Sequence, residues 1–416
     1  MPARVFDAHK SLLFPPTFAG SENAYKRVRR VVHGETRKRS ELDEAHLREA
    51  LQKAGARRLA GADEVWVALD TSDLRKPHAG EMEALMEVRD LDGRPVPGYR
   101  VLNALGITPG GRGLLYHRLF SSMETGFKSE PHEYRQAVRS VGTALTREGV
   151  AVDVTWLLDR AFDDRAFWGV VWEQEQHLVC RLQHLNRWVR APDKLGRYRK
   201  TRVERYGFRL PQVARVETEL QVRKGKQRKA KKQPVTVLLY AGPMKVEFQV
   251  GRAAEQEPLT KQVWLMRVQI LGSSNRLWLM TDHPIESAED ARRVFQMYRM
   301  RWAVEDAFKF IKQSLGWEEV QVLALEAIRF LVAMAAVAAA FLFEWSVTLE
   351  WEGVQLLARL GGWIPRKDAR PGKIILSRGL RRLIDLMATR AILRDYLDNH
   401  DELPPQIAAF VPDDFL

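Results

Sequence analysis

The feature that most constrains the fold of this sequence is an uninterrupted apolar run, FLVAMAAVAAAFLF, from Phe330 to Phe343. Its 14 residues fall short of the roughly 20 that a helix needs to cross a bilayer. A helix that is apolar on all sides has to be buried, and its alanines favour close packing against another element. We therefore expect a buried helix at residues 323–346, inside a core large enough to enclose it.

Composition and charge limit the class of protein. A chain of 416 residues, 45% hydrophobic and 29% charged, is typical of a globular protein with two or three domains and excludes fibrous, collagen-like and disordered classes. The net charge of +13 favours a polyanionic partner, nucleic acid ahead of a membrane surface. The single cysteine, Cys180, excludes an intramolecular disulfide and a cysteine-based zinc site. With no secretory signal visible, we expect a cytoplasmic protein without a membrane partner.

The first 62 residues have a helical and strongly charged sequence. Seven cations precede the helical segment ELDEAHLREALQKAG: Lys26, Arg27, Arg29, Arg30, Arg37, Lys38 and Arg39. A solvated helical face would explain them, and so would a region that contacts DNA. We predict a DNA-binding region at 1–62.

Two β-rich segments each end on an acid. EVWVALD ends at Asp70 and precedes a polar turn, and two further β-type runs at 84–90 and 98–108 predict a three-stranded antiparallel meander. VAVDVTWLLD ends at Asp159, after a predicted helix at 131–148. A helix and the short strand HLVCRLQ follow Asp159, an order that predicts a parallel crossover unit.

Residues 185–280 form a β-rich segment with a basic loop. Seven Lys or Arg residues fall within 223–232, between stretches that alternate in hydrophobicity, and Lys224 and Lys229 are candidates to lie along a phosphate backbone. A solvated loop is the alternative. KQVWLMRVQI and RLWLMTD predict a hairpin. A helical period begins after Ile285, with Ser287 and Gly316 as expected caps.

The chemistry centres on three acids. Asp70 and Asp159 each end a predicted strand, where side chains project into the crevice that open α/β sheets use for ligands, although either could cap its own turn. Glu305 shares a helical stripe with Tyr298, Arg301 and Lys312, at spacings i, i+3, i+7 and i+14. The alternative is that this stripe is a salt-bridged helix face on the surface. The apolar helix that follows directly argues against it.

The segment YRMRWAVEDAFKFIK resembles a signature of bacterial insertion-sequence transposases of the DDE type: Tyr, two residues, Arg, three residues, Glu, six residues, Lys. VALDTSD and LLDRAFDD are similar to that family's first and second acid blocks, so the resemblance spans about residues 64–346. It implies an α/β fold with an RNase-H-like mixed sheet and flanking helices. The catalytic domain would comprise 63–184 and 281–350, interrupted by a β-rich insertion at 185–280, with a helical region at 351–416 for DNA or dimer contacts.

The resemblance also implies a two-metal catalytic site. Asp70, Asp159 and Glu305 would be the catalytic acids and would bind two Mg²⁺ ions about 4 Å apart, for which Mn²⁺ could substitute. We assign Asp70 as the ligand shared by both ions. The nearby acids are expected in turn, capping or solvated roles: Asp73, Asp163, Asp164 and Asp306.

Further residues are implied as DNA contacts. Tyr298, Arg301 and Lys312 would bind phosphates at the transposon end, with Lys309 close to the same face. Arg160 and Arg181 match basic positions near the second acid, although salt bridges would also explain them. Trp278, or Trp264, is a candidate to stack on a flipped base, against the alternative of packing within the sheet.

The function that follows from the resemblance is DNA transposition. The enzyme would bind the terminal inverted repeats of its element, cleave the strands and join them to target DNA, in a cut-and-paste reaction. Its partners would be double-stranded DNA and a second copy of the chain in a synaptic complex, at the bacterial nucleoid. An RNase-H-like nuclease without strand transfer and a domesticated DNA-binding repressor are the alternatives.

Overall fold

The computed structural model describes residues 43–411, except for 151–152, 223–230, 249–258, 320–321, 365–370, 401, 405–407 and 409–410. The basic cluster predicted at residues 26–39 lies outside this range, as do Lys224 and Lys229 of the predicted basic loop. The fold divides into two compact units. The sheet unit comprises Gln52–Asp73 and Arg100–Asp306, and the helical unit comprises the described parts of Met1–Leu51, Leu74–Tyr99 and Ala307–Leu416.

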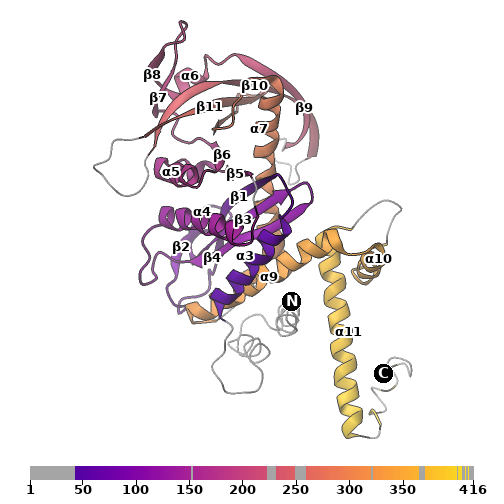
Figure 1. Ribbon diagram of the computed structural model, residues 1–416. Coiled ribbons are helices and arrows are strands. Elements are labelled where there is room, and N and C mark those ends of the chain that lie inside the picture. Colours follow the sequence, from indigo (N-terminus) through magenta and orange to yellow (C-terminus); the bar gives the residue numbers. More distant parts are fainter. Residues whose placement is uncertain are drawn as a thin grey trace. The chain divides into compact units, whose positions relative to one another are not determined.

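A mixed sheet dominates the sheet unit (Figure 1). Three central strands are parallel neighbours, β1 next to β5 and β5 next to β6, whereas the strands on both sides of them pair antiparallel. The strands of the unit, in spatial order, are β3 (Pro95–Thr108), β1 (Glu64–Arg75), β5 (Asp153–Leu158), β6 (His177–Arg181), β12 (Arg276–Thr281), β11 (Leu259–Ile270), β10 (Lys231–Phe248), β7 (Trp188–Pro192) and β8 (Tyr198–Arg202), with β4 (Gly111–Phe120) on β3 and β9 (Gln212–Val222) on β10.

Helices cover the parallel strands on both faces. Val154, Trp156 and Leu158 of β5 belong to one apolar core with residues of α4 (Glu130–Arg147) and α5 (Arg165–Glu173). The intervening side chains of β5 point to the opposite face, because side chains alternate along a strand. α7 (Ala288–Met300) packs against β5 and β6, and since its buried residues are not part of the first core we place it on that opposite face. This two-sided covering explains why the parallel strands are almost continuously apolar.

Local sequence signals account for the helix starts. Ser129 accepts a hydrogen bond from the backbone N–H of His132 at the start of α4, which has a proline in its first turn. Ser287 forms a capping box with Asp290 at the start of α7, so the predicted cap is confirmed. The predicted crossover is confirmed as well, because β5 and β6 are parallel and α5 connects them.

The β-rich segment at 185–280 extends the central sheet. The predicted β11–β12 hairpin is confirmed, and β12 also pairs antiparallel with β6, Met280 opposite Cys180. The short helix α6 (Val203–Gly207) lies between β8 and β9. The inserted strands therefore continue the same hydrogen-bonded ladder as the strands that carry the candidate acids.

Two expectations for the first strands are wrong. β1 continues through the predicted turn to Arg75, so Asp70 lies within the strand. The first strands are not a consecutive meander either, because β3 lies between β2 (Met86–Arg89) and β1. β4 was not expected at all. Pairing with a neighbouring strand stabilises extended backbone through residues that otherwise favour turns.

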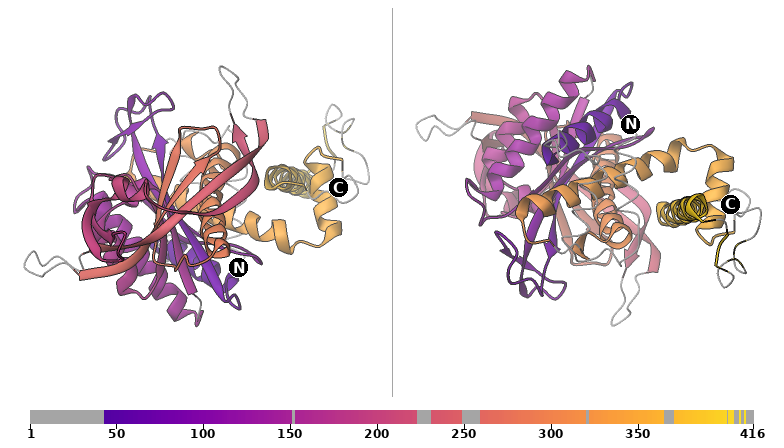
Figure 2. Two further views of the ribbon diagram at one scale, coloured as in Figure 1. Left: turned by 90° about the horizontal axis from the view of Figure 1, so that it is seen from above. Right: turned by 90° about the horizontal axis from the view of Figure 1, so that it is seen from below.

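Helices make up most of the helical unit. It holds most of α8 (Trp302–Leu315), then η3 (Trp317–Glu319), α9 (Leu325–Thr348), α10 (Trp351–Leu360) and α11 (Lys373–Asn399), together with the first half of α3 (Glu44–Arg58) and β2. α10 packs beside α11, which Figure 2 views almost along its axis. Gly379 of α11 allows this approach, because a Cβ there would lie 1.8 Å from the carbonyl oxygen of Leu357.

The predicted buried helix is confirmed as α9, and it is longer than expected at 24 residues. By length and composition it could cross a membrane, but 78% of its most apolar window is buried inside the structure. Core helices commonly have this character. Its side chains contact other helices of the unit, as Phe343 does with Phe310 of α8.

Candidate active site

The register of the parallel strands places the first two acids side by side. Leu69 of β1 is opposite Leu158 of β5, and both belong to the core under α4 and α5. Asp70 is the next residue of β1, and Asp159 follows β5 directly in an extended conformation, so their side chains leave the opposite face of the sheet, the face of α7. Sequences far apart in the chain thereby contribute adjacent carboxylates.

The third acid reaches this position through the joint between α7 and α8. Arg301 connects the two helices and keeps a helical conformation, with φ −51° and ψ −34°, so the predicted stripe from Tyr298 to Glu305 survives the joint. The Arg301 Nη1 atom donates to Asp70 Oδ2 at 3.2 Å, and Nη2 donates to Glu305 Oε1 at 2.6 Å. One guanidinium therefore joins an acid of β1 to an acid of α8.

Asp159 has an arginine of its own. Arg181, at the end of β6, donates from Nη1 to Asp159 Oδ1 at 3.4 Å. Tyr298 is buried beside Arg301, with its ring centre 5.9 Å from the guanidinium carbon, and burial raises the pKa of its phenol to about 12. The three acids are thus surrounded by two arginines and a neutral phenol.

Electrostatics show that the acids interact. Burial raises the pKa of Asp70 to about 6, and the carboxylates of Glu305 and Asp159 add to this, whereas Arg301 and the Thr71 N–H oppose it. Burial alone would lower the pKa of Arg301, but Tyr298 and the three carboxylates raise it. Like charges in mutual reach, compensated by a buried cation, are a common arrangement in functional sites.

The donor chemistry fits a hard divalent cation, because three carboxylates supply the oxygen ligands that Mg²⁺ and Mn²⁺ prefer. The arrangement is not a preassembled metal site, however. In the described part of the chain, no three His, Cys, Asp or Glu side chains are placed to hold an ion together. Asp70 and Glu305 direct oxygens to Arg301 instead. A metal on the oxygens that Arg301 binds would require these two side chains to exchange partners.

The structure changes the interpretation of two predicted DNA contacts. Arg301 is 4% exposed and its guanidinium binds carboxylates, so phosphate binding by this residue stays a prediction that requires its release. Trp278 is buried in this structure, so base stacking by this residue likewise stays a prediction that requires its release. Its ring is buried between Phe208, in an edge-to-face contact, and Gly207, where a Cβ would lie 1.9 Å from the indole. The alternative of packing within the sheet is the one found, while Trp264 is half-buried.

The remaining predicted contacts are dispersed. Arg160 is exposed immediately after Asp159, in the short helix η2 (Arg160–Phe162), and Arg181 is paired with Asp159. In the helical unit, Lys309 is exposed on α8, whereas Lys312 lies 3.6 Å from Glu318 and beside the Trp317 ring. None of these positions tests a DNA contact, so their roles stay predictions.

The neighbouring acids have structural partners. Asp73 lies 3.2 Å from Arg100, and Asp164 caps α5 by accepting a hydrogen bond from the Phe167 N–H at 2.7 Å, so the predicted capping role of Asp164 is confirmed. Asp306 is 56% exposed. Sequence reasoning missed Asp163, whose fully buried carboxylate binds backbone N–H groups and Arg187. The Arg301–Glu305 ion pair, four residues apart, is the salt bridge raised as an alternative for this stripe, whereas the second partner of Arg301, Asp70, was missed.

A comparison with protein families finds a transposase domain in part of this chain. Residues 157–341 match the family model of the transposase DDE domain, a range that includes Asp159 and Glu305 but not Asp70. A cryo-EM structure of the piggyBac transposase synaptic complex with hairpin DNA is similar over 100% of this chain and 79% of that chain, at 10% identity and a TM-score of 0.42. No curated protein is similar to the chain in sequence.

Proposed function

We propose that this chain is a metal-dependent DNA transposase of the DDE type, with Asp70, Asp159 and Glu305 as its catalytic acids. The observation that carries the proposal is their convergence. Parallel pairing sets Asp70 beside Asp159, and Arg301 joins Asp70 to Glu305. The transposase DDE domain match across Asp159 and Glu305 supports the same assignment. The central strands and helices would then be an RNase-H-like catalytic core of a bacterial insertion-sequence transposase.

The acids suit the chemistry of phosphodiester cleavage. When bound, two Mg²⁺ ions would activate the attacking oxygen and stabilise the leaving one. Asp70, Asp159 and Glu305 would hold these ions, with Asp70 as the shared ligand because it lies on the strand beside Asp159 and is joined to Glu305 by Arg301. Asp70 and Tyr298 are largely buried, so water is partly excluded around them. Metal ions and carboxylates would therefore interact strongly there.

The partner in this proposal is double-stranded DNA. A net charge of +13 supports a polyanionic partner. The hairpin of β7 and β8 adds a local basic surface, where Arg202 and Lys200 lie over the 45% exposed ring of Trp188. The enzyme would bind the terminal inverted repeats, cut them and transfer the strands to a target. Two ends held together imply a homodimer in the synaptic complex.

The test is cleavage of a labelled duplex that carries the element's own end, with Mg²⁺, Mn²⁺ or EDTA, resolved on a denaturing gel. We expect metal-dependent cleavage at the end boundary and joined products with target DNA. Asp70→Asn, Asp159→Asn and Glu305→Gln should each lower the cleavage rate by at least about a thousandfold, because each removes a metal ligand worth several kcal/mol in the transition state. DNA binding should persist in all three variants.

Asp306→Asn is the matched control, because Asp306 adjoins Glu305 in sequence and is exposed. It should cleave at the normal rate. Cleavage retained in any acid variant contradicts that site assignment. Cleavage without joined products would indicate a nuclease, and binding without cleavage under any metal would indicate a DNA-binding repressor.

A further inference from the structure

We propose that Arg301 is an internal cation that holds Asp70 and Glu305 in the metal-free protein and that a divalent ion must displace from them. This inference rests on the proposed function, since it concerns the ligands of the same metal site. It makes Arg301 a positioning residue whose partners change when the metal binds.

The geometry places one cation on two of the three acids. The two terminal nitrogens of Arg301 bind Asp70 Oδ2 and Glu305 Oε1, at 3.2 Å and 2.6 Å. Its side chain is only 5% exposed and that of Asp70 is 20% exposed, so water screens this pair little, whereas the Glu305 side chain is 47% exposed. Its buried Nε has no hydrogen-bond partner among the described residues. The carboxylates are therefore the groups that hold the guanidinium in place.

Charge explains why a cation is needed there. Glu305 and Asp159 both act electrostatically on Asp70, and neighbouring carboxylates without compensation repel each other in a partly buried setting. Arg181 compensates Asp159, and Arg301 compensates the other two. Two arginines thus offset part of the charge of the three carboxylates.

A metal on the oxygens that bind Arg301 would compete with this residue. A Mg²⁺ or Mn²⁺ ion binds carboxylate oxygens directly, so an ion on Asp70 Oδ2 and Glu305 Oε1 has to displace the guanidinium from them. Arg301 also repels the incoming ion while it stays in place. Metal binding therefore includes the cost of breaking two charge-assisted hydrogen bonds, and the intact protein should bind the ion more weakly than the acids alone allow.

This competition predicts the sign of a mutational effect. Removal of the competing charge in Arg301→Gln should tighten Mn²⁺ binding by about tenfold or more. If Arg301 instead only holds the acids in a metal-ready arrangement, the same variant should bind Mn²⁺ more weakly. The two roles therefore predict opposite changes.

The experiment measures Mn²⁺ binding to the full-length protein without DNA, by calorimetry and by the electron paramagnetic resonance signal of free Mn²⁺. Unfolding temperatures in EDTA and in Mn²⁺ are measured alongside. In EDTA, Arg301→Gln should unfold at a lower temperature than the wild-type protein. Addition of Mn²⁺ should raise its unfolding temperature by more than it raises that of the wild type. Arg301→Lys keeps the charge but lacks the fork that binds both acids, so its Mn²⁺ affinity should lie between the two.

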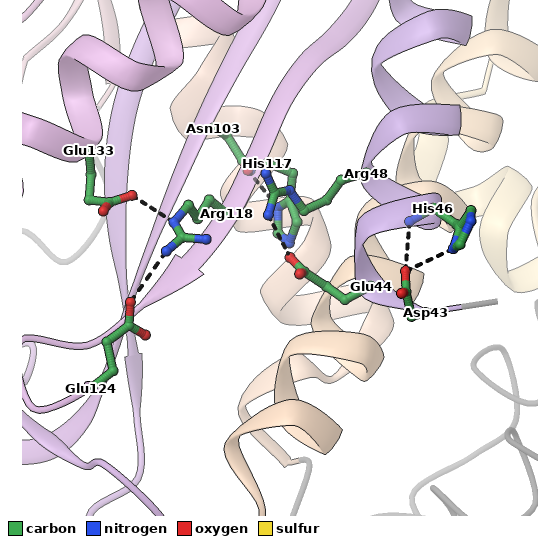
Figure 3. Close-up of polar contacts among 9 residues, drawn as sticks. All are labelled: Asp43, Glu44, His46, Arg48, Asn103, His117, Arg118, Glu124 and Glu133. Carbon is green, nitrogen blue, oxygen red and sulfur yellow. Dashed lines mark hydrogen bonds and ion pairs between the residues drawn. The ribbon is translucent and has the colours of Figure 1, made fainter. Parts of the chain in front are cut away.

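Arg118→Gln is the matched control. Arg118 likewise joins two carboxylates, with Nε 2.6 Å from Glu133 and Nη2 3.3 Å from Glu124 (Figure 3). Its partner Glu133 belongs to α4, on the face of the sheet opposite α7 and the three acids. We expect this variant to lose stability equally in EDTA and in Mn²⁺, with unchanged Mn²⁺ affinity.

Unchanged or weaker Mn²⁺ binding by Arg301→Gln overturns the proposal. An increase in Mn²⁺ affinity in Arg118→Gln as large as that in Arg301→Gln also overturns it. If Arg301→Gln does not fold, Arg301→Lys decides: tighter binding supports the proposal and unchanged or weaker binding overturns it. These outcomes leave the proposed function standing as long as the normal protein binds Mn²⁺ and cleaves DNA. Absence of Mn²⁺ binding in every variant, together with absence of cleavage, would remove the proposed function itself.

Discussion

Asp159 and Asp163 are four residues apart, and we expect their replacement to have opposite consequences. The Asp163 carboxylate is fully buried. Its Oδ2 accepts hydrogen bonds from the backbone N–H groups of Gln183 and His184, at 2.7 Å and 2.8 Å, and its Oδ1 pairs with Arg187. Asp163 thereby fixes the turn after β6, the strand that ends with the Asp159 partner Arg181. Asp159 itself is 27% exposed and has one long ion pair at 3.4 Å.

The magnitude follows from these contacts. A hydrogen bond to a charged group contributes roughly 1.5–3 kcal/mol, and loss of one partner of a buried ion pair costs about 3–5 kcal/mol. Because the three contacts share one carboxylate, their contributions do not add. We expect Asp163→Ala to lower the free energy of unfolding by about 3–5 kcal/mol. Asp159→Ala should change it by no more than about 0.5 kcal/mol while it abolishes cleavage.

Hydrogen exchange of peptides that span residues 177–190 is the suitable assay, since it reports local opening in a chain with two units. Asp193→Ala is the control, because Asp193 accepts backbone N–H groups of Leu195 and Arg197 in the same way at the surface. It should have a much smaller effect. A loss below about 1 kcal/mol in Asp163→Ala would refute the reasoning. So would equal losses in Asp163→Ala and the double variant Asp163→Ala with Arg187→Met, because removal of both partners should restore stability.

Two further predictions concern packing and pH. Gly379→Ala should lower the stability of the α10–α11 pair by about 1–3 kcal/mol or more, because its Cβ would meet the Leu357 carbonyl at 1.8 Å. Thermal unfolding measures this change. Gly372→Ala is the control and should show no loss of stability, because its Cβ would point into open space. A hydrogen bond to Asp282 at 2.9 Å raises the pKa of His177 above 6.5, so its stabilisation is present below that pH and is lost as the pH rises through the raised pKa. Denaturant unfolding should therefore show a larger loss for His177→Gln near about pH 5.5 than near about pH 8.5, and an equal loss at both would contradict this.

Much of the secondary structure was predictable because its signals are local. Apolar runs identified β5 and β6, helical spacing identified α4, and Ser287 marked the start of α7. The strand β4 was missed because its glycines favour turns. In the structure they serve close packing: a Cβ on Gly113 would lie 2.5 Å from the carbonyl oxygen of Gly55 in α3. Only the approach of that helix explains glycine within a strand.

The candidate site was partly predictable. The residue types and spacing singled out Asp70, Asp159 and Glu305 before their positions were known. The sequence could not show that Asp163 is buried, nor that Trp278 packs against Phe208. Both outcomes depend on which residues from distant segments cover the side chain, and a local pattern does not contain that information.

By itself the sequence determined most of the elements and the chemistry available to them, because strand and helix periods and carboxylate ligands are properties of short segments. The tertiary structure alone decided the partners. Register between β1 and β5 set Asp70 beside Asp159, and the joint between α7 and α8 directed Arg301 onto Asp70 and Glu305. The physical reason is that the electrostatic free energy of a buried charge depends on the charges next to it and on the exclusion of water. Only the assembled fold determines both.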